Sequence, residues 1–349
     1  MNRKKTKVIK VGNVFIGGHN PISIQSMTNT ATKDVISTVA QIKKLEVAGC
    51  NIIRSAITDL EDAKAIKYIK KEISIPMIAD IQYDYKLALE SIKYGIDGLR
   101  LNPGNIGSLD KVREVVKACK DNGISIRVGV NAGSLKKEFL EEYNGVNEDS
   151  MVYSALEQIR LLEDMGFYDI KISLKASNVP LTIKAYEKMS SMVDYPLHLG
   201  ITEAGPLWQG TIKSSVGIGT LLSMGIGDTI RISLTGDPVE EVKVGREILK
   251  SLGLLKEGLE IISCPTCGRT NIDLINIVKE AEKRLEGINK YIKVAIMGCA
   301  VNGPGEAREA DIGIAGGKGE GLIFRKGQII KKVEEEYLLD ELLKEIEKL

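Results

Sequence analysis

The sequence predicts an α/β fold in which a (β/α)8 TIM barrel is followed by a smaller α/β domain. Up to residue 252, one unit occurs eight times: a short β-branched strand, a turn and an amphipathic helix. Eight such units are typical of a TIM barrel. The pattern changes after a linker-like segment, residues 253–258, so we expect domains at 1–253 and 259–349.

Composition narrows the possible functions. Of the 349 residues 43% are hydrophobic, and 48 Lys and Arg against 47 Asp and Glu give a net charge of +1. No global field would therefore attract nucleic acid or an acidic membrane, and no apolar run has the length of a membrane span. The basic start lacks the apolar core of a signal peptide, and the five cysteines lack the spacing of a disulfide framework. We expect a cytoplasmic protein with no nucleic-acid or membrane partner.

The predicted elements follow one another along the chain. Residues 8–16 precede the first unit and are expected to cap the barrel. Helical patterns such as 34–49, 108–122 and 238–252 separate the strands, and 136–149 forms a polar excursion. The second domain should contain a strand ending at Cys264, a helix over 271–286, a strand over 292–297, a hairpin over 312–333 and a last helix. The barrel strands are centred near Ile24, Ile53, Ile78, Arg100, Arg127, Ile172, His198 and Ile232.

Alternation within these strands predicts an unusual barrel interior. In the strand over 229–234 the apolar residues share one face, and Arg231 and Ser233 share the other. The strands near residues 100, 127, 172 and 198 show the same division. The outer helices must cover the apolar faces, so the polar faces point into the barrel, where branched aliphatic side chains are usual. We therefore expect a basic interior, called the lumen below.

The charge of the lumen cations could be balanced in two ways. Each could be paired with an acid such as Asp80 or Glu203. However, the inward-facing acids are too few, and a buried cation without counter-charge costs several kcal/mol. A bound polyanion would complete the balance, and arginine favours phosphate oxygens, so we expect a small diphosphate or phosphorylated metabolite at the carboxyl ends of the strands. The cations concerned are Arg54, Arg100, Arg127, Lys175 and Arg231.

Two further candidate residues belong to the seventh strand and to the loop that follows it. His198, one of two histidines, is either a hydrogen-bonded core residue or a ligand. Glu203 follows the strand and is either a general acid or an ion-pair partner of a lumen cation. The sequence alone leaves both alternatives open.

The second domain contains a pattern of metal ligands. Cys264 and Cys267 form a C-x-x-C pair, and Cys299 is followed by Glu306 in a glycine-rich turn. Three thiolates suit either a structural zinc ion or a [4Fe-4S] cluster. There is no second C-x-x-C pair and no histidine after His198, so a fourth ligand must be a carboxylate or solvent. That set favours a cluster with one exchangeable iron.

Five motifs together resemble one family. They are QSMTNT at 25–30, RLNPGNIG at 100–107, RVGVNAGSL at 127–135, LHLGITEAG at 197–205 and NGPGEAR at 302–308. The chain resembles the bacterial 4-hydroxy-3-methylbut-2-enyl diphosphate synthases over essentially its whole length. The resemblance implies an iron-sulfur oxidoreductase of the non-mevalonate isoprenoid pathway, in the two-domain form in which the barrel precedes a [4Fe-4S] domain.

The resemblance also implies the reaction and its participants. The enzyme would convert 2-C-methyl-D-erythritol 2,4-cyclodiphosphate to 4-hydroxy-3-methylbut-2-enyl diphosphate by reductive ring opening and dehydration. Reduced flavodoxin or ferredoxin would supply two electrons, one at a time. Glu203 would face the cluster across the substrate and manage a proton, and Glu306 would give way to substrate at the iron.

By the same resemblance, each domain supplies one set of ligands. The cluster would be held by Cys264, Cys267, Cys299 and Glu306. The diphosphate would be bound by Arg54, Arg100, Arg127, Asn131, Lys175, Arg231 and Ser233. One departure is visible: the family usually has Asp-Ile-His-Phe-Asp-Tyr where this chain has DIQYDY at 80–85. Gln82 cannot carry a charge at that position.

Chain geometry predicts a homodimer. The eighth barrel helix, about 15 residues or about 22 Å long, ends at the bottom of the barrel, whereas the basic site opens at the top. The linker of six residues reaches about 20 Å at full stretch, which does not easily carry the second domain over its own lumen. We therefore expect a head-to-tail homodimer in which each active site combines one chain's cluster domain with the other chain's barrel.

Two other classes of function remain open. The first is a zinc-stabilised TIM-barrel phosphosugar lyase or isomerase that uses the barrel alone. The second is a nonenzymatic module in which the C-terminal part binds nucleic acid. Residues 264–349 show no interleaving of basic and aromatic residues, which disfavours the second class.

Overall fold

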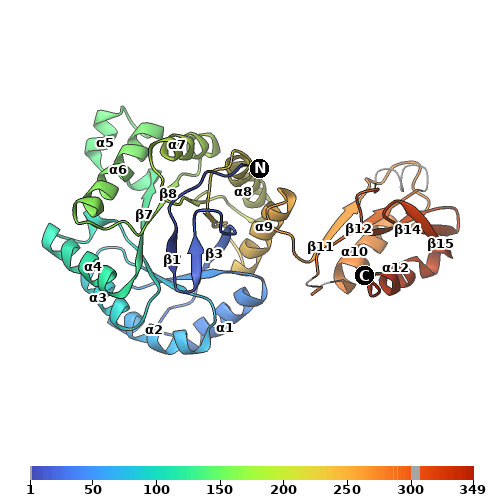
Figure 1. Ribbon diagram of the computed structural model, residues 1–349, viewed down its shortest axis with the longest axis horizontal. Coiled ribbons are helices and arrows are strands. Elements are labelled where there is room, and N and C mark those ends of the chain that lie inside the picture. Colours follow the sequence, from blue (N-terminus) through green and yellow to red (C-terminus); the bar gives the residue numbers. More distant parts are fainter. Residues whose placement is uncertain (1, 286, 289, 300–306) are drawn as a thin grey trace. The chain divides into compact units, whose positions relative to one another are not determined.

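The computed structural model describes residues 2–285, 287–288, 290–299 and 307–349 of the chain. Two compact units, Met1–Leu254 and Leu255–Leu349, make up the fold (Figure 1). The first unit is a barrel of eight parallel strands in the order β8-β7-β6-β5-β4-β3-β10-β9, and a parallel bridge between Ile172 and Leu197 joins β8 to the β9 side. The strands are β3 (Ser23–Met27), β4 (Ile52–Ala56), β5 (Met77–Asp80), β6 (Gly98–Arg100), β7 (Ser125–Asn131), β8 (Ile170–Lys175), β9 (His198–Leu199) and β10 (Thr229–Ile230). The predicted TIM barrel is confirmed.

Helices surround the barrel and cover the apolar faces of its strands (Figure 1). Several begin at an Asp or Asn whose side chain accepts a hydrogen bond from the first turn, as Asp59 does from the backbone N–H groups of Glu61 and Asp62. The short elements η1 (Pro103–Asn105), η2 (Ala132–Ser134) and α5 (Lys137–Glu142) lie in the loops after β6 and β7. The main helices are α1 (Val35–Val47), α2 (Leu60–Glu72), α3 (Tyr85–Lys93), α4 (Leu109–Asn122), α6 (Glu148–Asp164), α7 (Val179–Met192), α8 (Leu207–Ser223) and α9 (Pro238–Ser251).

The eighth barrel strand is shorter than the sequence suggests. We expected its centre near Ile232, but β10 ends at Ile230. Beyond that point the N–H of Arg231 donates to the carbonyl of Leu199 at 2.9 Å, and an isolated parallel bridge pairs Thr235 with Pro206. The neighbouring strand β9 is also only two residues long.

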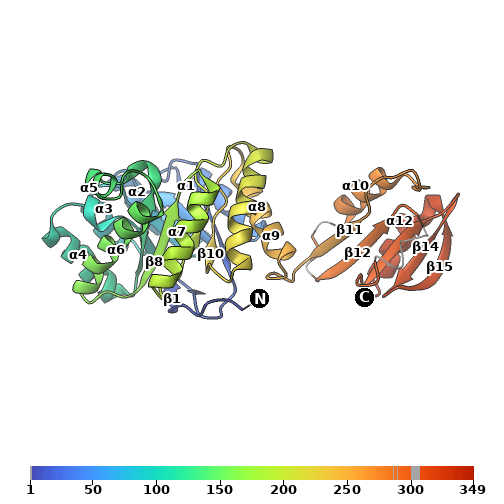
Figure 2. The ribbon, with the colours of Figure 1, turned by 90° about the horizontal axis from the view of Figure 1, so that it is seen from above.

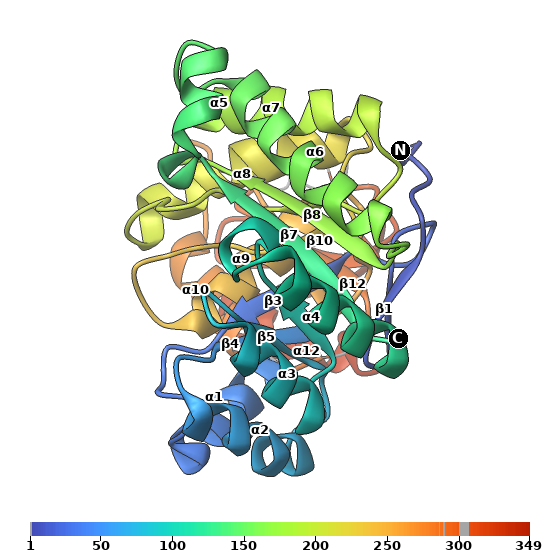
Figure 3. The same cartoon turned by 90° about the vertical axis from the view of Figure 1, so that its left-hand side faces the viewer.

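A hairpin covers the amino-terminal end of the barrel, where the sequence predicts a cap (Figure 3). Its strands β1 (Ile9–Val11) and β2 (Val14–Ile16) pair antiparallel across a turn in which Gly12 takes a positive φ of 58°. The buried side chains of Val11 and Ile16 pack against Ile52 and Ile78, which open β4 and lie early in β5. The lower lumen is therefore aliphatic, and its charged part begins above this layer.

The second unit is a five-stranded sheet covered by helices (Figure 2). Strands β11 (Leu259–Ser263), β12 (Ile292–Met297) and β13 (Ile312–Gly316) are parallel, and β14 (Glu320–Arg325) and β15 (Gln328–Glu334) complete an antiparallel meander. The predicted hairpin is thus part of a three-stranded arrangement. Helices α10 (Leu274–Arg284) and α12 (Leu338–Ile346), the latter preceded by η3 (Glu335–Tyr337), pack on the sheet around a core that includes Ile296 and Ile314.

No helix within the described ranges of the chain combines the length and the apolar character needed to cross a bilayer.

The hairpin offers a test of what closes the barrel. Ile16 is fully buried against the barrel floor, whereas its neighbour Phe15 is 53% exposed on the other face of the same strand. Replacing Ile16 with Ala should lower the free energy of unfolding by about 2–5 kcal/mol, because it leaves a cavity in the floor. Phe15→Ala should change it by less than about 0.5 kcal/mol. Urea unfolding measures both, and equal losses would show that the hairpin does not seal the barrel.

Candidate active site

A row of charged side chains crosses four adjacent strands inside the barrel. Asp80 on β5 is in register with Arg100 on β6, which pairs with Arg127 on β7, which in turn pairs with Lys171 on β8. The residues on either side of them in the strands, such as Leu99 and Ile126, are fully buried apolar groups under the helices. The row therefore lies on the lumen face, as strand alternation predicts.

Two acids pair with the lumen cations, Asp80 from inside the barrel and Glu241 from helix α9. The carboxylate of Asp80 lies 3.5 Å from Nε of Arg54 and 3.3 Å from Nη1 of Arg100. Glu241, on α9, lies 3.9 Å from Nε of Arg231 and accepts hydrogen bonds from Ser26 Oγ at 3.3 Å and from the N–H of Leu234 at 3.0 Å. Both carboxylates are already engaged without any ligand.

The positive charge in the lumen exceeds this counter-charge. Among the described residues, Asp80 and Glu241 are the acids paired with lumen cations. Nε and Nη1 of Arg127 and Nζ of Lys171 are buried and have no hydrogen-bond partner in the described part of the chain. The sequence left open whether each lumen cation is paired with an acid. In the described part of the chain, only some of them are. The lumen cations are Arg54, Arg100, Arg127, Lys171, Lys175 and Arg231.

Burial, together with repulsion between the cations, depresses the pKa values of Arg54, Arg127, Lys171 and Lys175. Burial, followed by the nearby charge of Arg231, lowers the pKa of Arg54 to about 9. Burial and the charge of Arg127 hold the pKa of Lys175 well below its ordinary value and lower the pKa of Lys171 to about 7. An anion in the lumen would favour the charged form of each of these groups.

Two glycines leave room for the long cationic side chains. A Cβ at Gly200 would lie 2.7 Å from Nζ of Lys175 and equally close to the carbonyl of Arg231. A Cβ at Gly129 would lie 3.2 Å from Nε of Arg100 and 3.1 Å from Oγ of Ser173. Contacts this short exclude a side chain at Gly200 unless the neighbouring groups shift, so glycine permits the close approach.

The remaining predicted substrate ligands lie at the carboxyl ends of the strands. Asn131 ends β7 in register with Lys175, and its Oδ1 accepts a hydrogen bond from the N–H of Gly133 at 3.1 Å. Ser233 follows β10 and is half-buried. The structure thus brings Asn131 to the same end of the barrel as Lys175.

Glu203 stands exposed in the loop that follows β9. Its φ of 52° lies in the left-handed region, which is costly for a residue with a side chain and is common at functional sites. Hydrogen bonds fix the loop on both sides: Thr202 N–H donates to the carbonyl of Ala176 at 3.2 Å, and Thr235 N–H donates to that of Gly205 at 3.0 Å. The structure shows no ion pair between Glu203 and a described lumen cation, which was one of the two expected roles.

His198 is fully buried in the lumen. Its Nδ1 lies 3.4 Å from Oγ1 of Thr229, whereas Nε2 has no partner in the described part of the chain. Burial and the neighbouring charges of Arg127 and Lys175 hold its pKa well below the ordinary value. The imidazole is therefore neutral at physiological pH and adds no charge to the lumen.

Gln82, the departure noted in the sequence, is exposed at the end of the barrel where the strands finish. Its Nε2 lies 3.5 Å from Oδ1 of Asp80, the oxygen that also contacts Arg100. The amide thus contacts the acid of the charged row without adding charge.

Two residues of the site, Lys171 and Glu241, were not among the predicted ligands. Lys171 shares its strand face with Lys175, so alternation marks it as inward, but it lies deeper than the carboxyl ends where ligands are expected. Glu241 gives a weaker signal, because an acid in the first turn of an amphipathic helix usually faces solvent and complements the helix dipole. Only its position beside the buried Val242 indicates burial.

The cysteines of the second unit lie on neighbouring loops. Cys264 follows β11 and Cys299 follows β12, two parallel neighbours, so both residues leave the same edge of the sheet. The N–H of Gly298 donates to Sγ of Cys264 at 3.2 Å, and the carbonyl of Gly298 accepts from Asn271 N–H at 2.9 Å. These bonds hold the Cys264 loop beside the residue that precedes Cys299.

The donor chemistry of these loops fits a thiolate-bound metal group. The backbone N–H of Arg269 lowers the pKa of the exposed Cys267, and its guanidinium adds to the effect, which favours the thiolate form that binds metal. By contrast, burial raises the pKa of Cys50 and of Cys119 to about 12, as expected for core thiols. Glu306 lies outside the described residues. Within the described ranges, no three His, Cys, Asp or Glu side chains are already gathered as a metal site.

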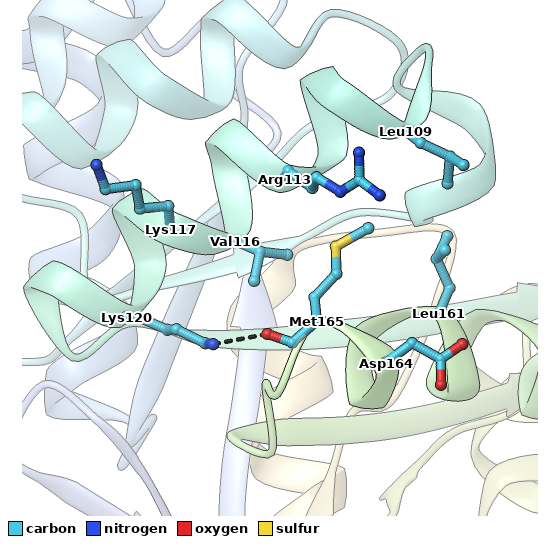
Figure 4. Close-up of a pocket in the computed structure, with 8 residues that line it drawn as sticks. All are labelled: Leu109, Arg113, Val116, Lys117, Lys120, Leu161, Asp164 and Met165. Carbon is cyan, nitrogen blue, oxygen red and sulfur yellow. Dashed lines mark hydrogen bonds between the residues drawn. The ribbon is translucent and has the colours of Figure 1, made fainter.

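A separate hollow of 470 Å³ lies on the outer surface of the barrel between α4 and α6 (Figure 4). Leu109, Val116 and Leu161 form its apolar lining, and Lys120 Nζ donates to the carbonyl of Met165 at 2.6 Å. Its lining residues belong to the outer helices, so this hollow is distinct from the cationic lumen.

The fold and these two groups of residues define a two-domain TIM-barrel enzyme. Residues 6–246 match the GcpE TIM-barrel domain, and residues 260–348 match the GcpE protein C-terminal domain. The chain therefore belongs to the GcpE family.

Relatives of high sequence identity agree with this assignment. A Clostridium perfringens protein is 64% identical over 99% of both chains, and one from Caldanaerobacter subterraneus subsp. tengcongensis is 65% identical over 99% of this chain and 98% of its own. Both are named 4-hydroxy-3-methylbut-2-en-1-yl diphosphate synthase (flavodoxin). The predicted family and enzyme class, an oxidoreductase of isoprenoid biosynthesis, are confirmed, and the family favours the synthase over the zinc-stabilised lyase or isomerase.

Solved structures show a likeness of fold alone. Dihydropteroate synthase from Stenotrophomonas maltophilia matches with a TM-score of 0.53 at 10% identity, over 71% of this chain and 97% of that chain. The Yersinia pestis enzyme matches with a TM-score of 0.51 at 11% identity, over 70% and 98%.

Proposed function

We propose that the barrel binds 2-C-methyl-D-erythritol 2,4-cyclodiphosphate and that the enzyme converts it to 4-hydroxy-3-methylbut-2-enyl diphosphate. The observation that carries the proposal is the excess of buried cations over acids among the described residues of the lumen, where N–H groups of Arg127 and Lys171 lack hydrogen-bond partners. A diphosphate would supply both the missing negative charge and the missing hydrogen-bond acceptors. The diphosphate stays in the product, so the same cations would hold substrate and product.

The proposed ligands differ in burial, and so in what each would contribute to binding. Arg127 and Arg54 lie deepest among them and are nearly enclosed, so their contacts with phosphate would be little screened by water. Asn131 and Ser233, nearer the ends of the strands, would add neutral hydrogen bonds that orient the ring. The full proposed set is Arg54, Arg100, Arg127, Asn131, Lys175, Arg231 and Ser233.

We propose that Cys264, Cys267 and Cys299 hold a [4Fe-4S] cluster, with Glu306 as the exchangeable fourth ligand. The adjacent loops of Cys264 and Cys299 and the lowered pKa of Cys267 support this assignment. When bound, the cluster would supply one-electron reduction and a Lewis-acidic iron. Reduced flavodoxin is the proposed donor, because the relatives' names include it, with ferredoxin as the alternative. A cytoplasmic location would keep these thiols reduced.

Loss of one cysteine ligand tests the cluster. The protein purified without oxygen should be brown and contain about four iron and four sulfide per chain. Cys299→Ser should lose most of both, because serine is a poor ligand for this cluster, whereas Cys119→Ala, at a core thiol of the barrel, should retain them. Iron and sulfide analysis with visible absorption decides the matter. A colourless, zinc-loaded protein would instead support the lyase or isomerase.

Glu203 is proposed to move a proton during loss of water. It is held at the carboxyl end of the barrel in a strained conformation and has no partner among the lumen cations that the structure describes. Glu203→Gln keeps the shape of the side chain but removes the proton, so turnover should fall about 100-fold to 10,000-fold with cluster content unchanged. Glu187→Gln, at an exposed site on α7, should behave as the parent enzyme. Unchanged turnover in Glu203→Gln would exclude it from the mechanism.

Chain geometry supports a head-to-tail homodimer as the proposed assembly. Helix α9 has 14 residues, about 21 Å, and in a (β/α)8 barrel it runs from the carboxyl ends of the strands back to the floor. The connection from α9 to β11, residues 252–258, reaches about 23 Å at full extension. Most of this length would be needed to run back along α9 to the carboxyl ends of the strands. A partner's lumen would therefore be easier to reach than the chain's own.

A mixed dimer tests whether active sites are shared. Cys299→Ser should disable the cluster unit, Arg231→Ala should disable the barrel, and each variant alone should be nearly inactive. After exchange of subunits, half of the dimers would be mixed, each with one intact site, so activity should recover to about one quarter of the parent value. The double variant Cys299→Ser/Arg231→Ala, exchanged with either single variant, should restore nothing. A mixture of the single variants that stays inactive would contradict shared sites.

A further inference from the structure

Lys171 is a buried cation that the binding scheme above does not use. It lies in β8 beside Arg127 and is 1% exposed. Its Nζ has no hydrogen-bond partner among the residues that the structure describes. A lysine in such a place is costly unless it is neutral or meets an anion.

The groups around Lys171 are mainly cationic or neutral. Arg127 from β7 and Arg54 from β4 both disfavour its charged form. The two described acids that pair with lumen cations are engaged elsewhere, Asp80 with Arg54 and Arg100, and Glu241 with Arg231. Other polar groups on the lumen faces of the strands include Ser23 and Gln25 on β3, Arg100 on β6, Ser125 on β7, Ser173 and Lys175 on β8, His198 on β9 and Thr229 on β10.

Several of these neutral groups also lack partners. Both amide atoms of Gln25, which is 1% exposed, and Nε2 of His198 are buried without a hydrogen bond in the described part of the chain. The imidazole of His198 interacts electrostatically with both Lys171 and Arg127. The layer of the lumen around Lys171 is therefore polar and short of negative charge. An anion bound above it would change the electrostatic potential at these groups.

We propose that Lys171 is a further positioning residue of the substrate site, which takes up a proton when the diphosphate enters the lumen and then supplies positive charge behind Arg127. The inference rests on the proposed function, because it assumes that the diphosphate binds among the lumen cations. In the free enzyme, burial and Arg127 lower the pKa of Lys171 to about 7, so its amine is mostly neutral above that pH. A bound dianion reverses the local potential and restores the ammonium form.

The substrate itself makes this uptake measurable. In a cyclic diphosphate, each phosphorus carries one ionisable oxygen, which is already deprotonated at neutral pH. The ligand therefore neither gains nor loses a proton on binding at this pH, and any proton taken up goes to the protein. Affinity should rise as the pH falls from about 9 toward 7, by up to about tenfold per pH unit for each proton bound, and level off below pH 7.

Calorimetric titration of the substrate measures the protons directly. The oxidised, cluster-loaded protein is titrated without electron donor at pH 7.5, in two buffers of different ionisation enthalpy. Lys171→Met should bind the substrate more weakly and take up about 0.8 fewer protons than the parent, the neutral fraction of a group with a pKa of about 7 at that pH. Lys171→Arg should recover affinity while showing the same loss of uptake, because guanidinium stays protonated.

Matched controls separate the possible outcomes. Lys93→Met, at a 65% exposed lysine on α3, should match the parent in both quantities. A merely structural role for Lys171 would lower stability without changing the proton count, so thermal unfolding is measured alongside. Should Lys171→Met fail to fold, Lys171→Arg carries the test. Proton uptake equal to the parent in either Lys171 variant overturns the inference, whereas failure of the parent protein to bind the substrate overturns the proposed function instead.

Discussion

Uncompensated positive charge at the centre of the barrel is the constraint on which the rest of the structure depends. Lys171 and Arg127 are almost fully buried, and Nζ of Lys171 and Nε and Nη1 of Arg127 have no acceptor in the described part of the chain. The carboxylates of Asp80 and Glu241 are already shared among other groups. Such an interior destabilises the folded state. The stabilising contribution must come from elsewhere, and the structure provides it in the apolar outer faces of the strands and in the aliphatic floor formed by the hairpin.

The charges are kept in place by the sheet rather than by one another. Strand register sets Asp80, Arg100, Arg127 and Lys171 side by side, and the closed barrel prevents any of these strands from turning its polar face outward. Glycine at position 200 leaves the space that Lys175 occupies. Since each cation is anchored by its own backbone, the site is formed before any ligand arrives, which lowers the cost of ordering side chains on binding.

Strand alternation was sufficient to predict the barrel and its basic lumen, because parallel strands are normally apolar on both faces and a regular polar face among them must line an interior. It could not predict Glu241, whose burial depends on how α9 packs against β3, nor the early end of β10, whose partner strand β9 is also only two residues long. The extra strand β15 was merged with its neighbour because only the turn around Lys326 and Gly327 separates them. The cysteine spacing indicated a metal site, but spacing alone does not fix where Cys267 and Cys299 lie relative to one another.

The side chains of the lumen can bind an anion, but they cannot supply the electrons for a reduction. Dihydropteroate synthases share the fold at about one tenth sequence identity, so the fold leaves the reaction open. The described polar groups of this lumen are guanidinium, ammonium, imidazole, amide, hydroxyl and carboxylate groups, and none of them accepts and returns single electrons at neutral pH. They can bind and orient an anion, but a reduction needs electrons from another group. In the second unit, Arg269 lowers the pKa of Cys267, which lies on an exposed loop, and so favours its thiolate form, whereas burial keeps the barrel's own thiols, Cys50 and Cys119, protonated. In the proposed function, therefore, the barrel would bind the substrate and the second unit would supply the electrons.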